Sequence, residues 1–185
     1  MFFRFSTKKT IQASGVLLEQ TRGRMGYLRL LKLLYIADRE HLQAFQRPII
    51  GTRLIAMKNG PLHSEVYDLV KGEHLAEPLW SEYIRRNGYE VELLKDPGVS
   101  ELSAAEVRTL TAISDRYRNL SEWDLVEVTH DFPEWLENYP RESEDTSHTI
   151  SFDSLLNAIG LQNEKPNILN DLQETVGMDR LFSRS

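Results

Sequence analysis

The feature that most constrains the fold is an apolar segment that runs from about Gly26 to Gln46. Its apolar residues recur at helical spacing along two adjacent stripes, Leu30, Leu33, Leu34, Ala37 and His41 on one and Tyr27, Leu31 and Leu34 on the other. A helix that is apolar over so much of its circumference has to be covered on several sides. We therefore predict that this helix forms the centre of the core. Arg47–Pro48 should end it, because proline disfavours a helical conformation in the residue before it.

Capping signals predict further helices along the chain. Ser103 and Glu106 form a capping box, and apolar pairs that resemble hydrophobic staples flank Ser121 and Ser151. The predicted helices begin at Ser6 or Thr7, at Pro61 (with Gly72 as the stop), at Ser103 and at Ser121, and two more cover about Phe152–Ile159 and the chain from about Pro166.

The β signals are fewer. Arg53–Met57 is predicted as a short strand, and Asn87–Gly88 between Tyr83–Arg85 and Tyr89–Leu93 indicates a two-residue hairpin. The predicted fold class is therefore mainly α, a compact helical domain with a small β-strand and hairpin element.

The polar stretch Arg141–His148 lacks an apolar rhythm and is predicted to be a linker. We expect one domain over residues 1–145 and a C-terminal helical extension over residues 146–185 that packs on the same domain. The chain has no cysteine, which excludes disulfides, a thiol nucleophile and thiolate metal ligands. Its apolar runs are shorter than the roughly 18 residues that a membrane span needs. We therefore expect a cytoplasmic protein with no membrane partner.

The formal net charge of −6 is unevenly distributed. Residues 1–60 hold 11 Lys/Arg against 3 Asp/Glu, and residues 119–145 hold 1 against 9. Such charges can simply solvate the surface. They can also steer basic partners to the acidic side of the molecule, and both interpretations stay open.

No sequence pattern indicates catalysis. The chain lacks a glycine-rich phosphate loop, a nucleophile elbow and a paired-histidine zinc helix, and its histidines are not at metal-ligand spacings. Asp38, Arg39, Glu40 and His41 are consecutive, so on a helix they point in different directions. We expect Asp38 to pair with Arg39 or another base. The prediction is a protein that is not an enzyme, with no catalytic residue, no cofactor and no metal.

A nucleic-acid-binding regulator is one alternative. Arg22, Arg24 and Arg29 cluster near a predicted turn between two helices, which could imitate a helix-turn-helix. The acidic chain, with a pI of about 5.4, and the apolar second helix argue against nucleic acid as a partner.

Aromatic residues gather in the acidic segment. Trp123, Phe132, Trp135 and Tyr139 lie close together in sequence. Such residues can belong to the core, or they can anchor a protein interface in which charged residues form the rim.

Three separated motifs make the chain resemble the Panacea domain of SocA-like antitoxins. They are Lys32–Asp38 (KLLYIAD), then Gly60–Pro61 followed by Glu65–Tyr67, then Leu120–Trp123 with Thr129–His130, Pro133 and Trp135. The similarity covers about residues 10–140. The sequence departs from the family pattern at Met57, where tryptophan is frequent, and at the polar Arg39–Leu42.

This resemblance implies a helical protein that neutralises a co-encoded protein toxin by direct contact, without catalytic residues. An adaptor that delivers its partner to a protease is a further alternative. Many motif residues suit a structural role, since Gly60–Pro61 can form a turn and His130 can end a helix. The residues that we predict at a partner surface are Tyr35, Asp38, Lys58, Tyr67, Trp123, His130 and Trp135.

Overall fold

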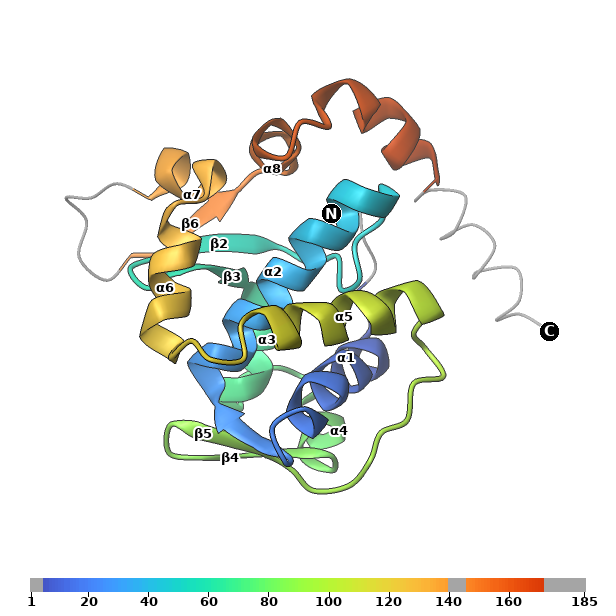
Figure 1. The fold of residues 1–185 in the computed structure, drawn as a ribbon, viewed down its shortest axis with the longest axis vertical. Coiled ribbons are helices and arrows are strands. Elements are labelled where there is room, and N and C mark those ends of the chain that lie inside the picture. The colour runs from blue at the N-terminus through green and yellow to red at the C-terminus, as the bar shows by residue number, and fades with distance from the viewer. Residues whose placement is uncertain (1–4, 140–145, 172–185) are drawn as a thin grey trace.

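The computed structural model describes residues 5–139 and 146–171. Helix α2 (Tyr27–Phe45) runs through the middle of the molecule, and the other elements surround it (Figure 1). Its residues from Leu30 to Asp38 are all buried, which confirms the predicted central helix. Gln46, with a left-handed φ of 58°, caps the helix one residue before Arg47–Pro48.

The helices with the most extensive contacts to α2 are α1 (Thr7–Glu19), α5 (Ala104–Arg116) and α6 (Glu122–His130). Each begins at a serine whose hydroxyl accepts a backbone N–H, namely Ser6, Ser103 and Ser121. These N-caps are the ones that the sequence indicates. The shorter helices are α3 (Ser64–Lys71), α4 (Glu77–Ser81) and α7 (Pro133–Asn138).

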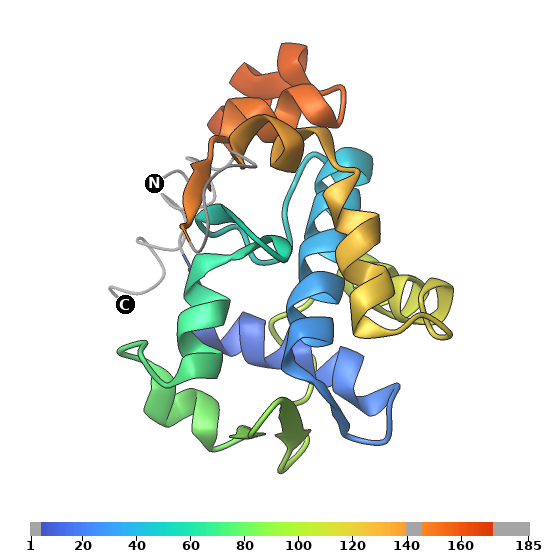
Figure 2. The same ribbon diagram turned by 90° about the vertical axis from the view of Figure 1, so that its left-hand side faces the viewer.

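Two small antiparallel sheets lie toward opposite ends of α2 in both views (Figures 1 and 2). One has the order β1 (Arg24–Gly26), β5 (Glu90–Leu93), β4 (Ile84–Asn87). The other has the order β3 (Gly60–His63), β2 (Leu54–Met57), β6 (His148–Ile150). The fold is thus mainly α with a small β component, as predicted.

The predicted β4–β5 hairpin is present, with its turn shifted by one residue. Asn87 pairs with Glu90, so the two turn residues are Gly88 and Tyr89. Gly88 has a φ of 62°, which glycine adopts without steric cost.

The prediction that Pro61 starts a helix is wrong. Pro61 lies in β3, opposite Ala56, and helix α3 begins at Ser64. Among the described residues β3 is an outer strand of its sheet, with β2 as its neighbour, and an edge strand tolerates a residue that lacks an N–H group. Two other strands, β1 and β6, were not predicted, because each is three residues long and forms only by pairing with a distant segment.

The C-terminal part contains α8 (Phe152–Ala158) and the 3-10 turn η1 (Gln162–Glu164). Its apolar residues cluster with Leu42 of α2, and they are Leu155, Leu156, Ile159 and Ile168. Residues 141–145 of the predicted linker lie outside the described residues, whereas His148 begins β6. The boundary between residues 1–145 and 146–185 stays a prediction. In the described part of the chain, every helix is too short or too polar to cross a membrane.

Candidate partner-binding site

The three motifs come together where α2, the β2–β3 hairpin and helices α6 and α7 pack against one another. At the centre lies Lys32, whose side chain is fully buried and whose Nζ donates to the Pro61 carbonyl at 2.8 Å. Burial lowers the pKa of Lys32 from 10.5 to about 7. Gly60 is packed beside it with a φ of 92°, and a Cβ there would lie 2.5 Å from Thr129 Oγ1 and 2.9 Å from Lys32 Nζ. Glycine is therefore required at position 60 by both conformation and space.

Asp38 holds the chain that follows α2. Its carboxylate accepts the backbone N–H groups of Ile49 and Ile50, the latter at 2.8 Å, and it accepts His63 Nε2 at 2.9 Å. Burial raises the pKa of Asp38, but the His63 interaction and the backbone donors outweigh it and keep this pKa below its ordinary value. The base paired with Asp38 is thus His63, from β3, while Arg39 has a different partner.

That partner is Glu134 at the start of α7. The Glu134 side chain is fully buried, and its Oε1 accepts both Tyr35 Oη at 3.0 Å and Arg39 Nε at 2.7 Å. Arg39 also stacks over the Phe132 ring, 4.4 Å from its centroid. Burial and the Glu134 carboxylate raise the pKa of Tyr35 well above its ordinary value. Sequence reasoning missed Glu134, because nothing local separates it from the exposed acids of the same segment.

A ring stack joins α6 and α7 to the turn of the hairpin. The His130 and Trp135 rings stack with centroids 4.0 Å apart. Trp135 Nε1 donates to the Met57 carbonyl at 2.9 Å, and His130 Nε2 lies 3.1 Å from the Lys58 carbonyl. Burial lowers the pKa of His130. Three predicted site residues, His130, Trp135 and Lys58, are therefore neighbours.

The predicted site residues differ in what they could offer a partner. Tyr35, Asp38 and Trp135 are buried, so in this conformation they lie beneath the surface and hold the surface elements in place. Lys58 is exposed, as is Trp123 near the start of α6 with 59% of its surface accessible. Tyr67 lies on α3, half-buried, with Lys71 Nζ 5.1 Å from its ring centroid.

The outward side of α6 and α7 combines apolar and acidic groups. Trp123 and Leu136, which is 46% accessible, are its large exposed apolar residues. Exposed carboxylates lie along the same two helices and at the C-cap of α6, and we call these exposed residues the acidic face: Asp124, Glu127, Asp131 and Glu137. Because Glu134 is buried and paired, the excess negative charge of this segment points outward.

The arginine cluster considered for nucleic-acid binding is largely engaged within the protein. Arg24 pairs with Glu92 at 2.8 Å. Arg29 donates to the carbonyls of Leu120 and Tyr117, the latter at 2.9 Å, and so holds the turn between α5 and α6. These contacts weigh against the nucleic-acid alternative. Among residues 5–139 and 146–171, no three His, Asp or Glu side chains are grouped as a metal site would require.

Residues 30–136 match a family model described as antitoxin SocA-like, Panacea domain. No curated protein and no solved structure matches the chain. The matched range begins within α2 and ends within α7, so it contains the Lys32, Asp38 and Glu134 networks. These networks join elements that lie within the matched range. The chain therefore belongs to the SocA-like antitoxin family.

Proposed function

We propose that this protein is the antitoxin of a toxin–antitoxin system, acting in the cytoplasm and neutralising a protein toxin by direct binding, without catalysing a reaction. The observation that carries this proposal is the family match, which spans more than half of the chain.

The acidic face is the surface that we propose for toxin contact. Trp123 and Leu136 could serve as apolar anchors, and tryptophan is among the residues enriched at interface hot spots. The carboxylates of this face favour a basic toxin surface, such as that of a protein acting on nucleic acids, and would accelerate encounter with it. The buried contacts of Glu134 and Trp135 fix α7 to α2 and β2, so little ordering should be required on binding.

A growth assay with copurification tests this function. The neighbouring reading frame is expressed alone and together with this protein, and the pair is then isolated through a tag on one partner. We expect the neighbour to be toxic alone, to be tolerated in the presence of this protein and to copurify with it. A harmless neighbour that does not copurify would contradict the proposal.

Variants locate the contact within the same assay. Trp123→Ala should weaken protection and copurification, because it removes an exposed anchor without disturbing the core. Leu75→Ala is the matched control, since Leu75 is fully exposed and distant from α6 in sequence. The adaptor role predicts in addition that toxin levels fall when this protein is present, and that a protease-deficient host restores them.

A further inference from the structure

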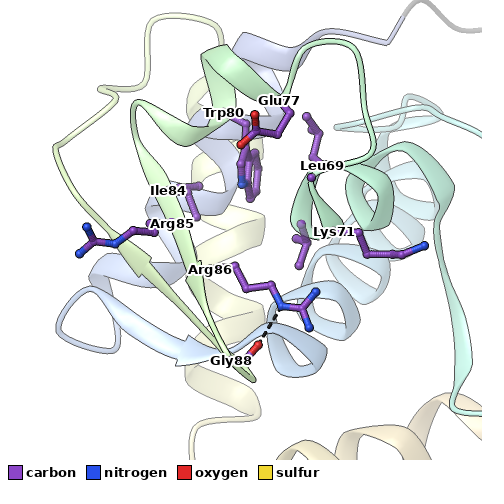
Figure 3. Close-up of a pocket in the computed structure, with 10 residues that line it drawn as sticks. Leu69, Lys71, Glu77, Trp80, Ile84, Arg85, Arg86 and Gly88 are labelled. Carbon is purple, nitrogen blue, oxygen red and sulfur yellow. Dashed lines mark hydrogen bonds between the residues drawn. The ribbon is translucent and has the colours of Figure 1, made fainter.

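A pocket of about 490 Å³ lies between α3, α4 and strand β4. Figure 3 shows two of its cations, Lys71 on α3 and Arg85 on β4, extending away from each other. Its apolar lining is almost completely covered, since Trp80 is 2% and Ile84 0% accessible. Binding sites are usually lined by accessible apolar groups with a few polar groups at fixed positions. This pocket does not fit that pattern.

A second pocket fits it better. This pocket has a volume of about 410 Å³ and lies between the C-terminal end of α2, the loop that follows, the start of β2, the end of β6, and α8. Figure 1 shows α8 close to the C-terminal end of α2, and Leu42 of α2 clusters with apolar residues of α8. The apolar residues that line the pocket are Leu42, Pro48, Leu54, Ile150, Phe152 and Leu155. Such walls can enclose the methylene groups of a long side chain.

A carboxylate lies at the inner end of this pocket. The Asp38 side chain is only 9% accessible, whereas Thr149 and Ser151, which also line the pocket, are exposed. The pocket therefore leads from hydroxyl groups at its mouth to a nearly buried carboxylate. Arg53 is the cation among the described lining residues, and its Nη2 donates to Ser64 Oγ at 2.6 Å. The Arg53 guanidinium is thus held at the start of α3.

The Asp38–His63 pair keeps a net negative charge. His63 Nε2 lies 2.9 Å from Asp38 Oδ2, and no described group bonds to the buried Nδ1 atom of the same ring. A protonated imidazole would bury a second N–H group without an acceptor, which costs free energy. The neutral ring, with its proton on Nε2, therefore fits these surroundings. The lowered pKa of Asp38 agrees with an ionised carboxylate beside it.

The hydrogen bonds of Asp38 leave room for one strong donor. Its Oδ1 accepts the N–H groups of both Ile49 and Ile50. Its Oδ2 accepts His63 Nε2, and the Gly51 N–H group lies 3.4 Å away, beyond the usual range of such bonds. A lysine ammonium is a compact charge that can use this single position. An arginine guanidinium binds best to both oxygens of a carboxylate.

We infer that this pocket binds a lysine side chain of a partner protein. The four-carbon stem lies between the apolar walls, and the ammonium donates to Asp38 Oδ2. Proteases that cleave after basic residues use a comparable arrangement, a pocket with an aspartate at its base. The inference goes beyond the toxin contact proposed at the acidic face, and it holds whether or not the partner is a toxin.

The test is a titration of the full-length, isotope-labelled protein with short peptides, followed by amide NMR. The probe is acetyl-Gly-Lys-Gly-amide, and the control peptides carry norleucine, arginine or glutamate in place of lysine. We expect the lysine peptide to shift the amide signals of Gly51, Thr52 and Ser151. Norleucine has a similar stem without the charge, so its peptide should bind about tenfold more weakly or less, and so should the other two.

Two variants test the position of the ammonium. D38N keeps the shape of the side chain and removes its charge, so it should bind the lysine peptide about tenfold more weakly. Because Asp38 also holds the loop after α2, T149K provides an independent test. It places a like charge at the exposed mouth and should weaken binding of the lysine peptide about fivefold. S81K is the matched control, since Ser81 is exposed on α4 and does not line the pocket. It should bind like the wild type.

Equal affinity for the lysine and norleucine peptides, shifts located elsewhere, or undiminished binding by T149K would overturn the inference. Butylammonium lacks the backbone groups that the exposed hydroxyls of Thr149 and Ser151 can bond, so it should bind more weakly than the peptide. Equally tight binding would assign the pocket to a free amine instead. Concentration-dependent shifts at Gly51 without peptide would indicate a second copy and would also overturn it. The titration contains no toxin, so its failure would leave the antitoxin proposal standing.

Discussion

Lys32→Met should change how the stability of this protein depends on pH. Lys32 is fully buried, and among the described residues its ammonium donates to the Pro61 carbonyl at 2.8 Å. Its pKa is about 7 in the folded protein and has the ordinary value of 10.5 when the side chain is solvated. Between these values the unfolded chain binds more protons than the folded one, so the free energy of unfolding rises with pH.

The magnitude follows from the size of this window. Each pKa unit corresponds to about 1.36 kcal/mol, so the complete shift represents roughly 5 kcal/mol. Between pH 7.5 and 9.5, Lys32 should add roughly 2–3 kcal/mol to the stability of the wild type. Lys32→Met lacks this contribution. At neutral pH the variant should be at least as stable as the wild type. Replacing the lysine removes the cost of burying its amine, and this cost is larger than the roughly 1–3 kcal/mol lost when the Pro61 carbonyl has no hydrogen-bond donor.

Urea unfolding of both proteins, followed by circular dichroism at several pH values, measures this effect. The decisive quantity is the wild-type free energy of unfolding minus that of the variant, because other titrating groups cancel in the difference. This difference should increase by roughly 2–3 kcal/mol from pH 7.5 to 9.5. Parallel pH profiles would refute the reasoning, since they would mean that Lys32 keeps its ordinary pKa in the folded protein.

Three further predictions follow from single contacts. Gly60→Ala should destabilise the protein by roughly 2–4 kcal/mol in urea unfolding, since it adds a clash to an unfavourable φ. Gly72 has a similar φ, but a Cβ added there would meet no atom of the described surroundings within 4 Å. Gly72→Ala should therefore lower the free energy of unfolding by only about 1 kcal/mol. Asp38→Asn should lower the free energy of unfolding by roughly 2–3 kcal/mol at pH 7. On acidification the variant should lose less stability than the wild type, because the wild type loses the contribution of the Asp38 carboxylate as pH falls through its lowered pKa. Reversing Glu127 and Asp131 to lysine should slow toxin association in stopped-flow measurements, with an effect that shrinks at high salt.

Each of these has an outcome that would contradict it. Equal losses for the two glycine variants would show that crowding at Gly60 is relieved by small movements of its neighbours. An unchanged acid profile for Asp38→Asn would mean that the pKa of Asp38 is not lowered in the folded protein. A toxin association rate that is insensitive to both salt and the reversed charges would show that the acidic face does not steer the toxin.

Features that depend on residues close together in the chain could be predicted from the sequence. The central helix follows from apolar spacing, and the starts of α1, α5, α6 and α8 follow from serine caps that bond the backbone three residues later. Asn87–Gly88 likewise marked the hairpin to within one residue. These signals are local, so a linear pattern contains them. The order of the three family motifs was also readable without a structure, and the family match covers the same region.

The pairing of polar residues from distant parts of the chain could not be predicted in this way. Tyr35 and Glu134 are 99 positions apart, and Asp38 and His63 are 25 apart. Glu134 looked like one more acid of an exposed segment, and Pro61 looked like the start of a helix. Only packing revealed that Glu134 is a buried partner of Arg39 and that Pro61 lies in an edge strand. The physical reason is that buried polar groups need partners, and burial depends on segments brought together from distant parts of the chain.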